Sequence, residues 1–509
     1  MTVATCDLEP GDVALAVPER LLITLDTVFE ADSDLAEALT TNPASELSCL
    51  ALFLMYEKRA GAASPWAPLI RELDRIQARG AQGAKSPLLW EAGQAAALLA
   101  GSPLADEVDA RQAAIAREYA ELDTIWFMAP PLFDRRSGER GAEPPTEAFS
   151  LALFRAAYAA VQASVVHLQG VPSSKRFALV PLGPPLLQYS STSRAALAWT
   201  DTGVAGGPGV VWTADAPVAA GAPIAAWCGP QPNRRLLLNY GIVDEVGGAK
   251  WRGRRRQWGR GALWRERGRA RAAFRPAFLS PLSRLSLLSS ALPPAQDNPF
   301  DEVKLTITLP TTDPLYSAKR AALQRGLGGP PASGGGGGGG GGGRGRGGGR
   351  SAPPHAGRGG AASTTSATYS TQHAFRLTRA APLPADLLPY LRLALSPDPA
   401  AAARPDALEA AAAPGSLGPA TEAAALGALT AYLQARLARY PTTVAQDDAT
   451  VASEAAGPRE KVAARLVRIE KGIWGGALAA VRAAAAAGSG AEGGGGEGGG
   501  ATVQGVRLS

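Results

Sequence analysis

Apolar and polar positions change their spacing along the chain, and each change predicts a change in secondary structure. Residues 13–18 (VALAVP) follow a Glu-Pro-Gly-Asp turn at 9–12 and are typical of a strand. Apolar side chains then recur every three or four residues, which predicts helices over residues 45–59, 105–127 and 146–168. Short apolar runs predict strands again at 176–182 and 209–227. Strands therefore flank a helical insertion, unlike the βαβ repeat of a dinucleotide-binding domain.

The second half of the chain returns to helical spacing after one more strand. Alternation at residues 298–309 (NPFDEVKLTITL) predicts that strand, and helices are predicted over residues 318–326, 385–395, 421–440 and 458–486. Thr421 is a suitable N-cap and Pro458 suits a first helical turn. The glycine-rich residues 328–370 and 486–509 bury too little apolar surface to fold, so we expect both to be disordered.

The positive charge of the chain comes from one segment. The 509 residues carry a formal net charge of +6, but residues 246–296 hold twelve Lys and Arg and one acidic residue. That segment is therefore +11, and the remaining chain is −5. A general basic surface is not predicted, and nucleic acid is not expected as a partner.

Cysteine, histidine and the apolar runs exclude several classes of protein. Three cysteines and three histidines are scattered without metal-ligand spacing, so neither a metal site nor a disulfide framework is expected. No apolar run reaches the ~18 residues of a membrane span. The chain starts without a signal-peptide pattern, and its first strand has no earlier partner, so we expect the start to be truncated.

Many short motifs follow one another in a fixed order along the chain. They are EPGDVALAVP at 9–18, LFLMYEK at 52–58, LAGSPL at 99–104, ALVPL at 178–182, LLLNYGIVD at 236–244, LLPYLR at 387–392, YPTT at 440–443 and IEKGI at 469–473. In this order they resemble SET-domain proteins of the Rubisco large-subunit lysine methyltransferase family. The resemblance covers most of residues 3–245 and 297–475.

The resemblance implies an α+β fold, a SET-domain β-fold with a helical insertion, followed by an all-helical substrate-binding domain. The SET domain is expected at 1–245 with its helical insert at about 45–170. The substrate-binding domain is expected at 297–485, interrupted by the glycine-rich loop 328–370 and followed by the tail 486–509. Protein substrates or protein partners would bind through this helical domain.

The basic segment 246–296 interrupts the match. Its removal joins Glu245 to Asp297 and gives continuous family-like sequence. The segment begins with valine, whose codons start with GT, and ends with glutamine, whose codon can be CAG. We therefore predict a translated intron. The alternative is a genuine basic loop that binds nucleic acid through Trp251, Trp258 and Trp264.

The resemblance also implies a reaction, the transfer of a methyl group from S-adenosyl-L-methionine to a neutral lysine amine. Tyr240 matches the family's catalytic tyrosine. The alternative for Tyr240 is a buried core tyrosine whose hydroxyl has a protein partner. Such a transfer requires sulfur, methyl and nitrogen in line, with the amine deprotonated.

The cofactor positions depart from the family pattern. Leu187 and Gln188 stand where the family has the Asn-His pair that binds adenine, and Val165 stands where its arginine contacts the cofactor carboxylate. Pro184 and Pro185 remove two backbone N–H donors. A degenerate cofactor site is therefore predicted.

Three functions remain open on the sequence. The first is an active protein-lysine N-methyltransferase, and the second is a catalytically inactive SET scaffold that binds protein partners. The third is a nucleic-acid-associated plastid protein. A plastid branch of the family resembles the LGPPLL sequence at 182–187, so the resemblance implies a chloroplast location.

Overall fold

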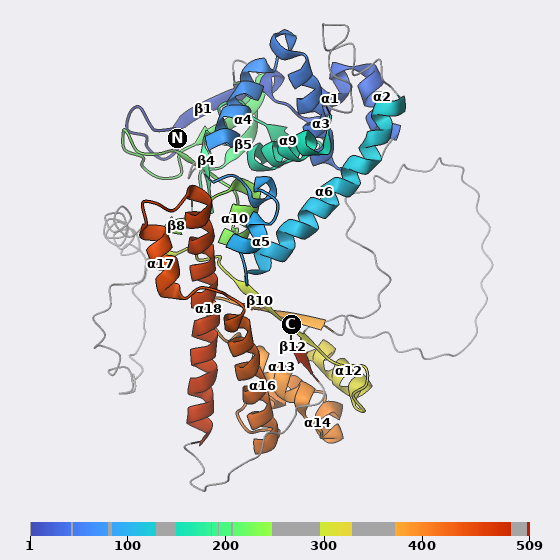
Figure 1. Ribbon diagram of the computed structural model, residues 1–509, viewed down its shortest axis with the longest axis vertical. Coiled ribbons are helices and arrows are strands. Elements are labelled where there is room, and N and C mark those ends of the chain that lie inside the picture. Colours follow the sequence, from blue (N-terminus) through green and yellow to red (C-terminus); the bar gives the residue numbers. More distant parts are fainter. Residues whose placement is uncertain are drawn as a thin grey trace, which may run out of the picture. The chain divides into compact units, whose positions relative to one another are not determined.

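The computed structural model describes residues 2–41, 44–79, 84–128, 149–184, 186–191, 193–204, 207–246, 296–327, 372–489 and 506–508. Its contacts divide the chain into two compact units (Figure 1). Unit 1 comprises Met1–Asp301 with Arg439–Lys471, and unit 2 comprises Glu302–Ala438 with Gly472–Ser509. The glycine-rich loop, nearly all of the basic segment and most of the tail lie outside the described residues, so the predictions made for them stay predictions.

Unit 1 contains small sheets that pair segments far apart in sequence. β1 (Val13–Pro18), β6 (Gly207–Thr213) and β5 (Leu197–Val204) form an antiparallel sheet in the order β1-β6-β5. β2 (Val165–His167) pairs with β3 (Phe177–Leu179), and β4 (Gln188–Ser190) runs parallel to β7 (Ala225–Trp227). β1 therefore pairs with a strand that lies later in the chain.

A single apolar cluster holds these sheets together. Val17, Val210 and Trp212 are each at most 4% exposed within it. The Trp212 indole donates to the Ala225 carbonyl oxygen at 3.1 Å, so its one polar atom is satisfied. The packed faces of β1, β6 and β7 therefore share one core, as the alternation of apolar residues predicts.

Helices fill the insertion between β1 and β2. They are α1 (Leu25–Ala31), α2 (Ser33–Thr41), α3 (Glu46–Arg59), α4 (Ala67–Arg79), α5 (Gln94–Leu98), α6 (Pro103–Met128) and α9 (Leu151–Ser164), with 3-10 turns η1 (Glu19–Leu21), η2 (Gly61–Ala63) and η3 (Pro87–Leu89). Ser45 caps α3 by accepting the Ser48 N–H. α3 and α6 confirm the predicted helices.

The helix predicted over 146–168 is wrong at its end. α9 stops at Ser164, and the next three residues form β2 instead. Val165 and Val166 are β-branched and pair with Leu179 and Ala178, so strand pairing outweighs the helical spacing of the apolar residues. The turn η5 (Ser173–Lys175) then leads into β3.

The rest of unit 1 lies around α10 (Asn233–Tyr240) and a short strand pair. β8 (Glu245–Val246) is antiparallel to β9 (Gln296–Asp297), with Glu245 opposite Asp297. The two ends of the basic segment are therefore direct neighbours. Residues 439–471 also belong to unit 1 and contain α17 (Val444–Ala452) and the first part of α18 (Pro458–Ser489).

Unit 2 is mainly helical and includes one small sheet. β10 (Val303–Thr308) lies between β11 (Gln372–Leu377) and β12 (Arg507–Leu508). The helices are α12 (Tyr316–Gly326), α13 (Leu387–Leu395), α14 (Pro399–Ala403), α15 (Ala407–Ala410), α16 (Pro419–Ala438) and the end of α18. The Arg392 guanidinium, 4% exposed, contacts Glu422 at 2.6 Å and links α13 to α16.

Two predictions about helix starts have different outcomes. Pro458 is the first residue of α18, as predicted. Thr421 is not an N-cap, because α16 begins at Pro419 and Thr421 is buried within its first turn. Within the described residues, no helix is both long and apolar enough to span a membrane. The predicted domain limits stay predictions.

Candidate active site

Tyr240 is the last residue of α10, and the chain turns sharply after it. Gly241 has φ +68°, and a Cβ atom there would lie 2.5 Å from the Ala84 carbonyl oxygen. The Ser86 hydroxyl donates to the Leu238 carbonyl oxygen at 2.6 Å, two residues before the end of the helix. The segment after residue 83 therefore supports the end of α10, and only glycine fits the position that follows Tyr240.

Three groups surround the Tyr240 side chain. Its ring lies 4.5 Å from the Tyr189 ring, between centroids. Its hydroxyl accepts the Gln231 side-chain N–H at 3.4 Å, and the same Gln231 nitrogen donates to the Cys228 carbonyl oxygen at 2.6 Å. The Tyr189 hydroxyl donates to the Val165 carbonyl oxygen at 2.6 Å. The site thus joins β2, β4, the loop after β7 and α10.

The ionisable groups of this cluster are neutral near pH 7. Burial and the nearby Cys228 raise the pKa of Tyr240 to about 12, and the Gln231 hydrogen bond opposes that shift. Burial, with Asp244 next in effect, raises the pKa of the Cys228 thiol to about 12. Burial also raises the pKa of Tyr189 well above its usual value. The cluster can therefore offer hydroxyl groups and carbonyl oxygens, but no anion, to a ligand.

A polar frame fixes the loop between β7 and α10. The Asn233 side chain accepts the Asp244 N–H at 2.6 Å and donates to one Asp301 carboxylate oxygen at 2.8 Å. Asp301 also accepts the Asn233 backbone N–H at 2.6 Å. The Asn298 side chain donates to the Gln231 carbonyl oxygen at 2.8 Å. This frame was not predicted, although the sequence match includes Asn233 and Asp301.

The structure places the predicted cofactor residues around the same cluster, but with few polar groups available. Val165 is 8% exposed, and its carbonyl oxygen is the acceptor for Tyr189. Leu187 is 3% exposed in the core, and its N–H donates to the Gly183 carbonyl oxygen at 3.1 Å. Gln188 is half-buried in β4 and keeps a side-chain amide. Of the three, only Gln188 fits a side-chain hydrogen bond to a charged cofactor.

The loop before Leu187 is tightly folded. Leu182 has φ +60°, in the region that favours glycine, and the Gly183 N–H donates to the Val180 carbonyl oxygen at 2.9 Å. Pro184 is buried and has no N–H to donate. Pro185 lies outside the described residues.

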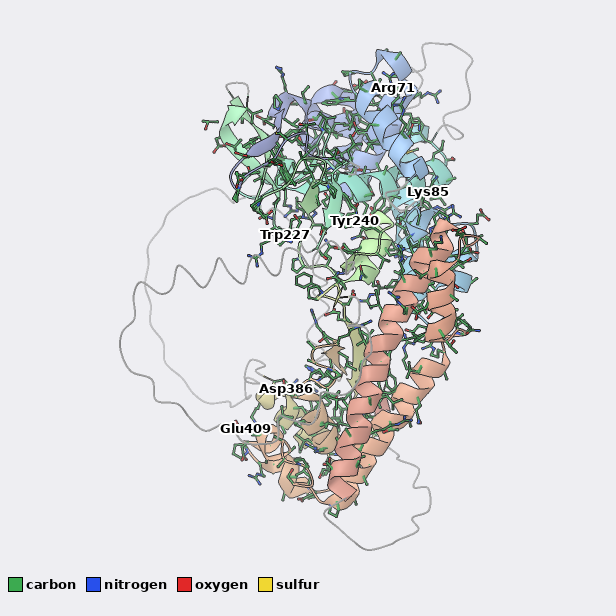
Figure 2. The ribbon with its side chains drawn as sticks, turned by 90° about the vertical axis from the view of Figure 1, so that its left-hand side faces the viewer. Arg71, Lys85, Trp227, Tyr240, Asp386 and Glu409 are labelled. Carbon is green, nitrogen blue, oxygen red and sulfur yellow. The ribbon has the colours of Figure 1, made fainter. Side chains whose placement is uncertain are left out.

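An exposed tryptophan borders the cluster. Trp227 is 43% exposed at the end of β7 and directly precedes Cys228. Figure 2 labels Trp227 and Tyr240 in this part of unit 1. A large apolar side chain at the edge of a buried cluster is suited to contact a ligand that reaches the site from solvent.

Comparisons with known proteins agree with this architecture. Residues 310–473, about a third of the chain, match the family described as Rubisco LSMT substrate-binding. Among solved structures, the SET domain of LSMT bound to lysine and AdoHcy shares 16% identity, with 95% of this chain and 84% of that chain covered and a TM-score of 0.58. No curated protein sequence matches the chain significantly.

Two further solved structures give the same result. Rubisco LSMT bound to AdoMet shares 17% identity, with 95% of this chain and 84% of that chain covered and a TM-score of 0.58. Rubisco LSMT bound to sinefungin and monomethyllysine shares 17% identity, with 95% and 85% covered and a TM-score of 0.59. The chain therefore has a fold similar to that of Rubisco LSMT, and its residues 310–473 match the substrate-binding family.

Proposed function

We propose that this chain is a protein-lysine N-methyltransferase that uses S-adenosyl-L-methionine, with Tyr240 at the substrate amine. The observation that carries the proposal is the Tyr240 hydroxyl, which sits at the end of α10 against Gln231 in a fold shared with Rubisco LSMT. The solved structures of that fold include complexes with lysine and AdoHcy and with AdoMet. The substrate would be a protein, because the C-terminal part matches a substrate-binding family.

The neutral state of Tyr240 defines what it can do. With a pKa of about 12, roughly one hydroxyl in 10⁴ is ionised at pH 8. Tyr240 is therefore an orienting group rather than a general base. Its oxygen accepts the Gln231 N–H, and the neutral hydroxyl would orient a lysine amine by hydrogen bonding rather than remove a proton from it.

S-adenosyl-L-methionine would supply the methyl group. Gln188 is the side chain among the three matching positions that would hydrogen-bond to it, and backbone groups would have to supply the remaining polar contacts. Loss of two charge-assisted contacts, each worth about 1.5–3 kcal/mol, would weaken binding by roughly 10²- to 10⁴-fold. We therefore expect weaker cofactor binding than a site with both contacts would give.

A second candidate is a cofactor-free scaffold that binds protein partners. Val165 and Leu187 favour this scaffold. Their side chains are buried and apolar, the Val165 carbonyl oxygen accepts the Tyr189 hydroxyl, and the Leu187 N–H donates to the Gly183 carbonyl oxygen. Calorimetric titration of the full chain with S-adenosyl-L-methionine separates the two functions. Absence of detectable heat at millimolar cofactor would reject the enzyme and favour the scaffold.

Methyl transfer is tested with the full chain, radiolabelled S-adenosyl-L-methionine and a plastid protein extract. Methyl-lysine should form with the natural chain and be lost with Tyr240→Phe. The matched control is Tyr119→Phe, because the Tyr119 hydroxyl also takes part in a hydrogen bond in unit 1, which it donates to the Phe149 carbonyl oxygen at 2.8 Å. Equal incorporation by the natural chain and Tyr240→Phe would contradict the role of Tyr240.

Location and further partners rest on resemblance. The Rubisco LSMT family implies a chloroplast location, which fluorescence microscopy of a tagged chain in its own cells can test. Binding of nucleic acid is not part of the proposal, because the net positive charge of the chain comes from residues 246–296. The intron prediction for that segment is tested by transcript sequencing, in which reads that join Glu245 directly to Asp297 would support it.

A further inference from the structure

The parallel strands β4 and β7 present two different faces. In their register Gln188 lies opposite Ala225, and Ser190 lies opposite Trp227. Side chains alternate along a strand and paired residues point to the same side, so Gln188, Ser190 and Trp227 share one face. Burial agrees with this alternation, because the middle residue of each strand is buried and the outer residues are less covered.

Trp227 is exposed although its backbone is hydrogen-bonded on both sides. Its N–H donates to the Ala195 carbonyl oxygen at 2.8 Å, and the next N–H, of Cys228, donates to the Ser190 carbonyl oxygen at 3.2 Å. The other tryptophans whose side chains the structure describes are buried or half-buried, and they are Trp66, Trp90, Trp199, Trp212 and Trp474. An exposed indole on a fixed backbone is suited to receive a flat ligand.

Adenine is the ligand whose chemistry fits this face. Its ring stacks on aromatic side chains, and its N6 amino group and N7 are the pair that a glutamine amide recognises with two hydrogen bonds. Neighbouring strands lie about 4.8 Å apart and two residues span about 6.6 Å, so the Cα atoms of Gln188 and Trp227 are about 8 Å apart. A long side chain reaches across such a diagonal, so the amide can meet the edge of a ring stacked on the indole.

The same face leads to the Tyr240 cluster. Cys228 directly follows Trp227, and its thiol is close enough to contribute to the raised pKa of Tyr240. The Cys228 carbonyl oxygen also accepts the Gln231 amide that contacts Tyr240. A nucleoside on Trp227 would therefore lie one residue away from the proposed site of methyl transfer.

The position that matches the carboxylate-binding arginine offers a cofactor much less. Val165 is 8% exposed, and its carbonyl oxygen accepts the Tyr189 hydroxyl at 2.6 Å. An apolar side chain cannot pair with the carboxylate of a methionine group. The binding free energy of the cofactor should therefore come mainly from its adenine end.

We propose that Trp227 is a cofactor-binding residue, with the adenine of S-adenosyl-L-methionine stacked on its indole and the Gln188 amide at the edge of that ring. The inference rests on the proposed methyltransferase function and deepens it, because it states which part of the cofactor the site recognises. The ligand class is adenine nucleosides that carry a sulfonium or thioether group at the 5′ carbon. The site distinguishes little between the groups that this sulfur carries.

The first test is calorimetric titration of the full chain with two probes. They are S-adenosyl-L-methionine and 5′-methylthioadenosine, which lacks the carboxylate and the amino group of the methionine part. The two Kd values should agree within about threefold. A site with a charge-assisted contact to the carboxylate would bind the second probe about 10- to 100-fold more weakly.

Variants of Trp227 test the stacking itself. Trp227→Ala should raise the Kd of both probes by about 5- to 100-fold, the effect of one lost base–aromatic stack, and Trp227→Phe should raise it by less than about fivefold. The matched control is Phe29→Ala, which removes another exposed aromatic side chain of unit 1, from α1. It should leave both Kd values unchanged.

The role of Gln188 is tested with a third probe, 5′-methylthioinosine, in which an oxygen replaces the N6 amino group. This probe should bind about 3- to 10-fold more weakly than 5′-methylthioadenosine, the effect of one lost hydrogen bond. Gln188→Met removes the amide at nearly constant length and should abolish the difference between the two probes. A difference that persists in Gln188→Met overturns the place given to Gln188.

The outcomes separate this inference from the proposed function. Unchanged Kd values in Trp227→Ala overturn the inference, even if methylation of proteins falls, because Trp227 would then contact the protein substrate. A natural chain that binds neither of the first two probes at millimolar concentration overturns it as well. Binding that depends on Trp227 without methyl transfer supports the inference and rejects the proposed function. Should Trp227→Ala not fold, Trp227→Leu also removes the flat ring and should weaken both probes equally.

Discussion

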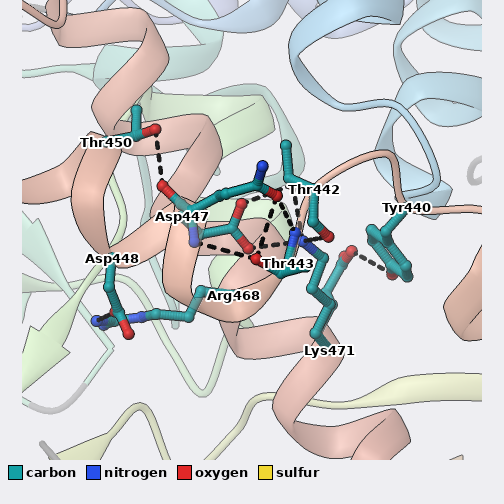
Figure 3. A network of polar contacts seen from close by, with 10 residues as sticks. Tyr440, Thr442, Thr443, Asp447, Asp448, Thr450, Arg468 and Lys471 are labelled. Atoms are coloured by element: carbon teal, nitrogen blue, oxygen red, sulfur yellow. Dashed lines mark hydrogen bonds and ion pairs between the residues drawn. The ribbon is translucent and has the colours of Figure 1, made fainter.

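The buried ion pair between Lys471 and Asp447 offers a quantitative test of how α17 is held to α18 (Figure 3). The Lys471 ammonium lies 2.7 Å from an Asp447 carboxylate oxygen, and both side chains are 4% exposed. It also donates to the Thr442 carbonyl oxygen at 2.5 Å and to the Thr442 hydroxyl at 2.8 Å. All three hydrogens of the ammonium therefore have acceptors.

Lys471→Met removes this cation and leaves the Asp447 carboxylate buried. Among the described residues, the Thr442 hydroxyl still donates to that carboxylate at 2.7 Å, but it cannot replace a full charge. Loss of one partner from a buried pair costs about 3–5 kcal/mol. Because ~1.4 kcal/mol is a factor of ten, amide hydrogen exchange in α17 should accelerate by roughly 10²-fold or more.

Hydrogen exchange measured by mass spectrometry is the suitable assay, because a chain with two units need not unfold in one step. The matched control is Lys58→Met. Lys58 lies at the same 2.7 Å from Asp74, but the two side chains are 56% and 55% exposed. Its loss should cost less than ~1 kcal/mol and accelerate exchange in α4 by less than about fivefold.

The double variant Lys471→Met with Asp447→Asn should recover most of the loss, because no uncompensated charge remains. If Lys471→Met accelerates exchange in α17 no more than Lys58→Met does in α4, burial does not set the cost of the broken pair. The reasoning would then be refuted. Failure of the double variant to recover would show instead that the packing of the lysine stem matters most.

Three further predictions concern other parts of the chain. Gly241→Ala should destabilise unit 1 by more than ~1 kcal/mol in urea unfolding, because the added Cβ would lie 2.5 Å from the Ala84 carbonyl oxygen. The control Gly427→Ala should stabilise the chain by about 1 kcal/mol, because a Cβ at this position in α16 meets no atom within 4 Å. Equal effects of the two substitutions would contradict this prediction. Deletion of residues 246–296 should leave the melting temperature unchanged or raise it, because the flanking Glu245 and Asp297 are already neighbours. A lower melting temperature would show that the segment packs against the rest of the chain. Burial lowers the pKa of His373 in the folded chain below its ordinary value of 6.5. Neutral His373 therefore contributes to the free energy of unfolding in full above pH 6.5, and this contribution is lost as the pH falls through the pKa of the folded state. The urea midpoint should therefore fall from pH 7.5 to pH 5, and less so in His373→Phe.

Local sequence patterns predicted correctly those helices and strands in which the spacing of apolar residues matches the secondary structure that forms. α3, α6 and β1 lie where the sequence places them, because in each the spacing of the apolar residues agrees with the element that forms. The error at Val165 arose because an apolar pair that is buried in a strand has the same sequence as one that is buried in a helix. Pairing with β3, ten or more residues downstream, decides between the two, and no local signal contains it.

The site was predictable only in part, for a similar reason. Tyr240 was found because it stands in a nine-residue motif that resembles the family, 236–244. Gln231 was not, because its contact with Tyr240 depends on the loop after β7 folding back against the end of α10. The burial of Val165 and Leu187 depends on pairs such as β4 with β7, which join residues 37 positions apart in sequence, Gln188 and Ala225.

The pairing of β1 with β6 also sets a timetable for synthesis. Val13 lies opposite Thr213, a separation of 200 residues. A ribosome adds about 5–20 residues per second, so β1 leaves the ribosome roughly 10–40 s before its partner exists. During that interval its apolar residues, Val17 among them, are exposed to chaperones and to other nascent chains. β1 therefore depends on protection during translation, and slower decoding of the helical insertion would lengthen its exposure.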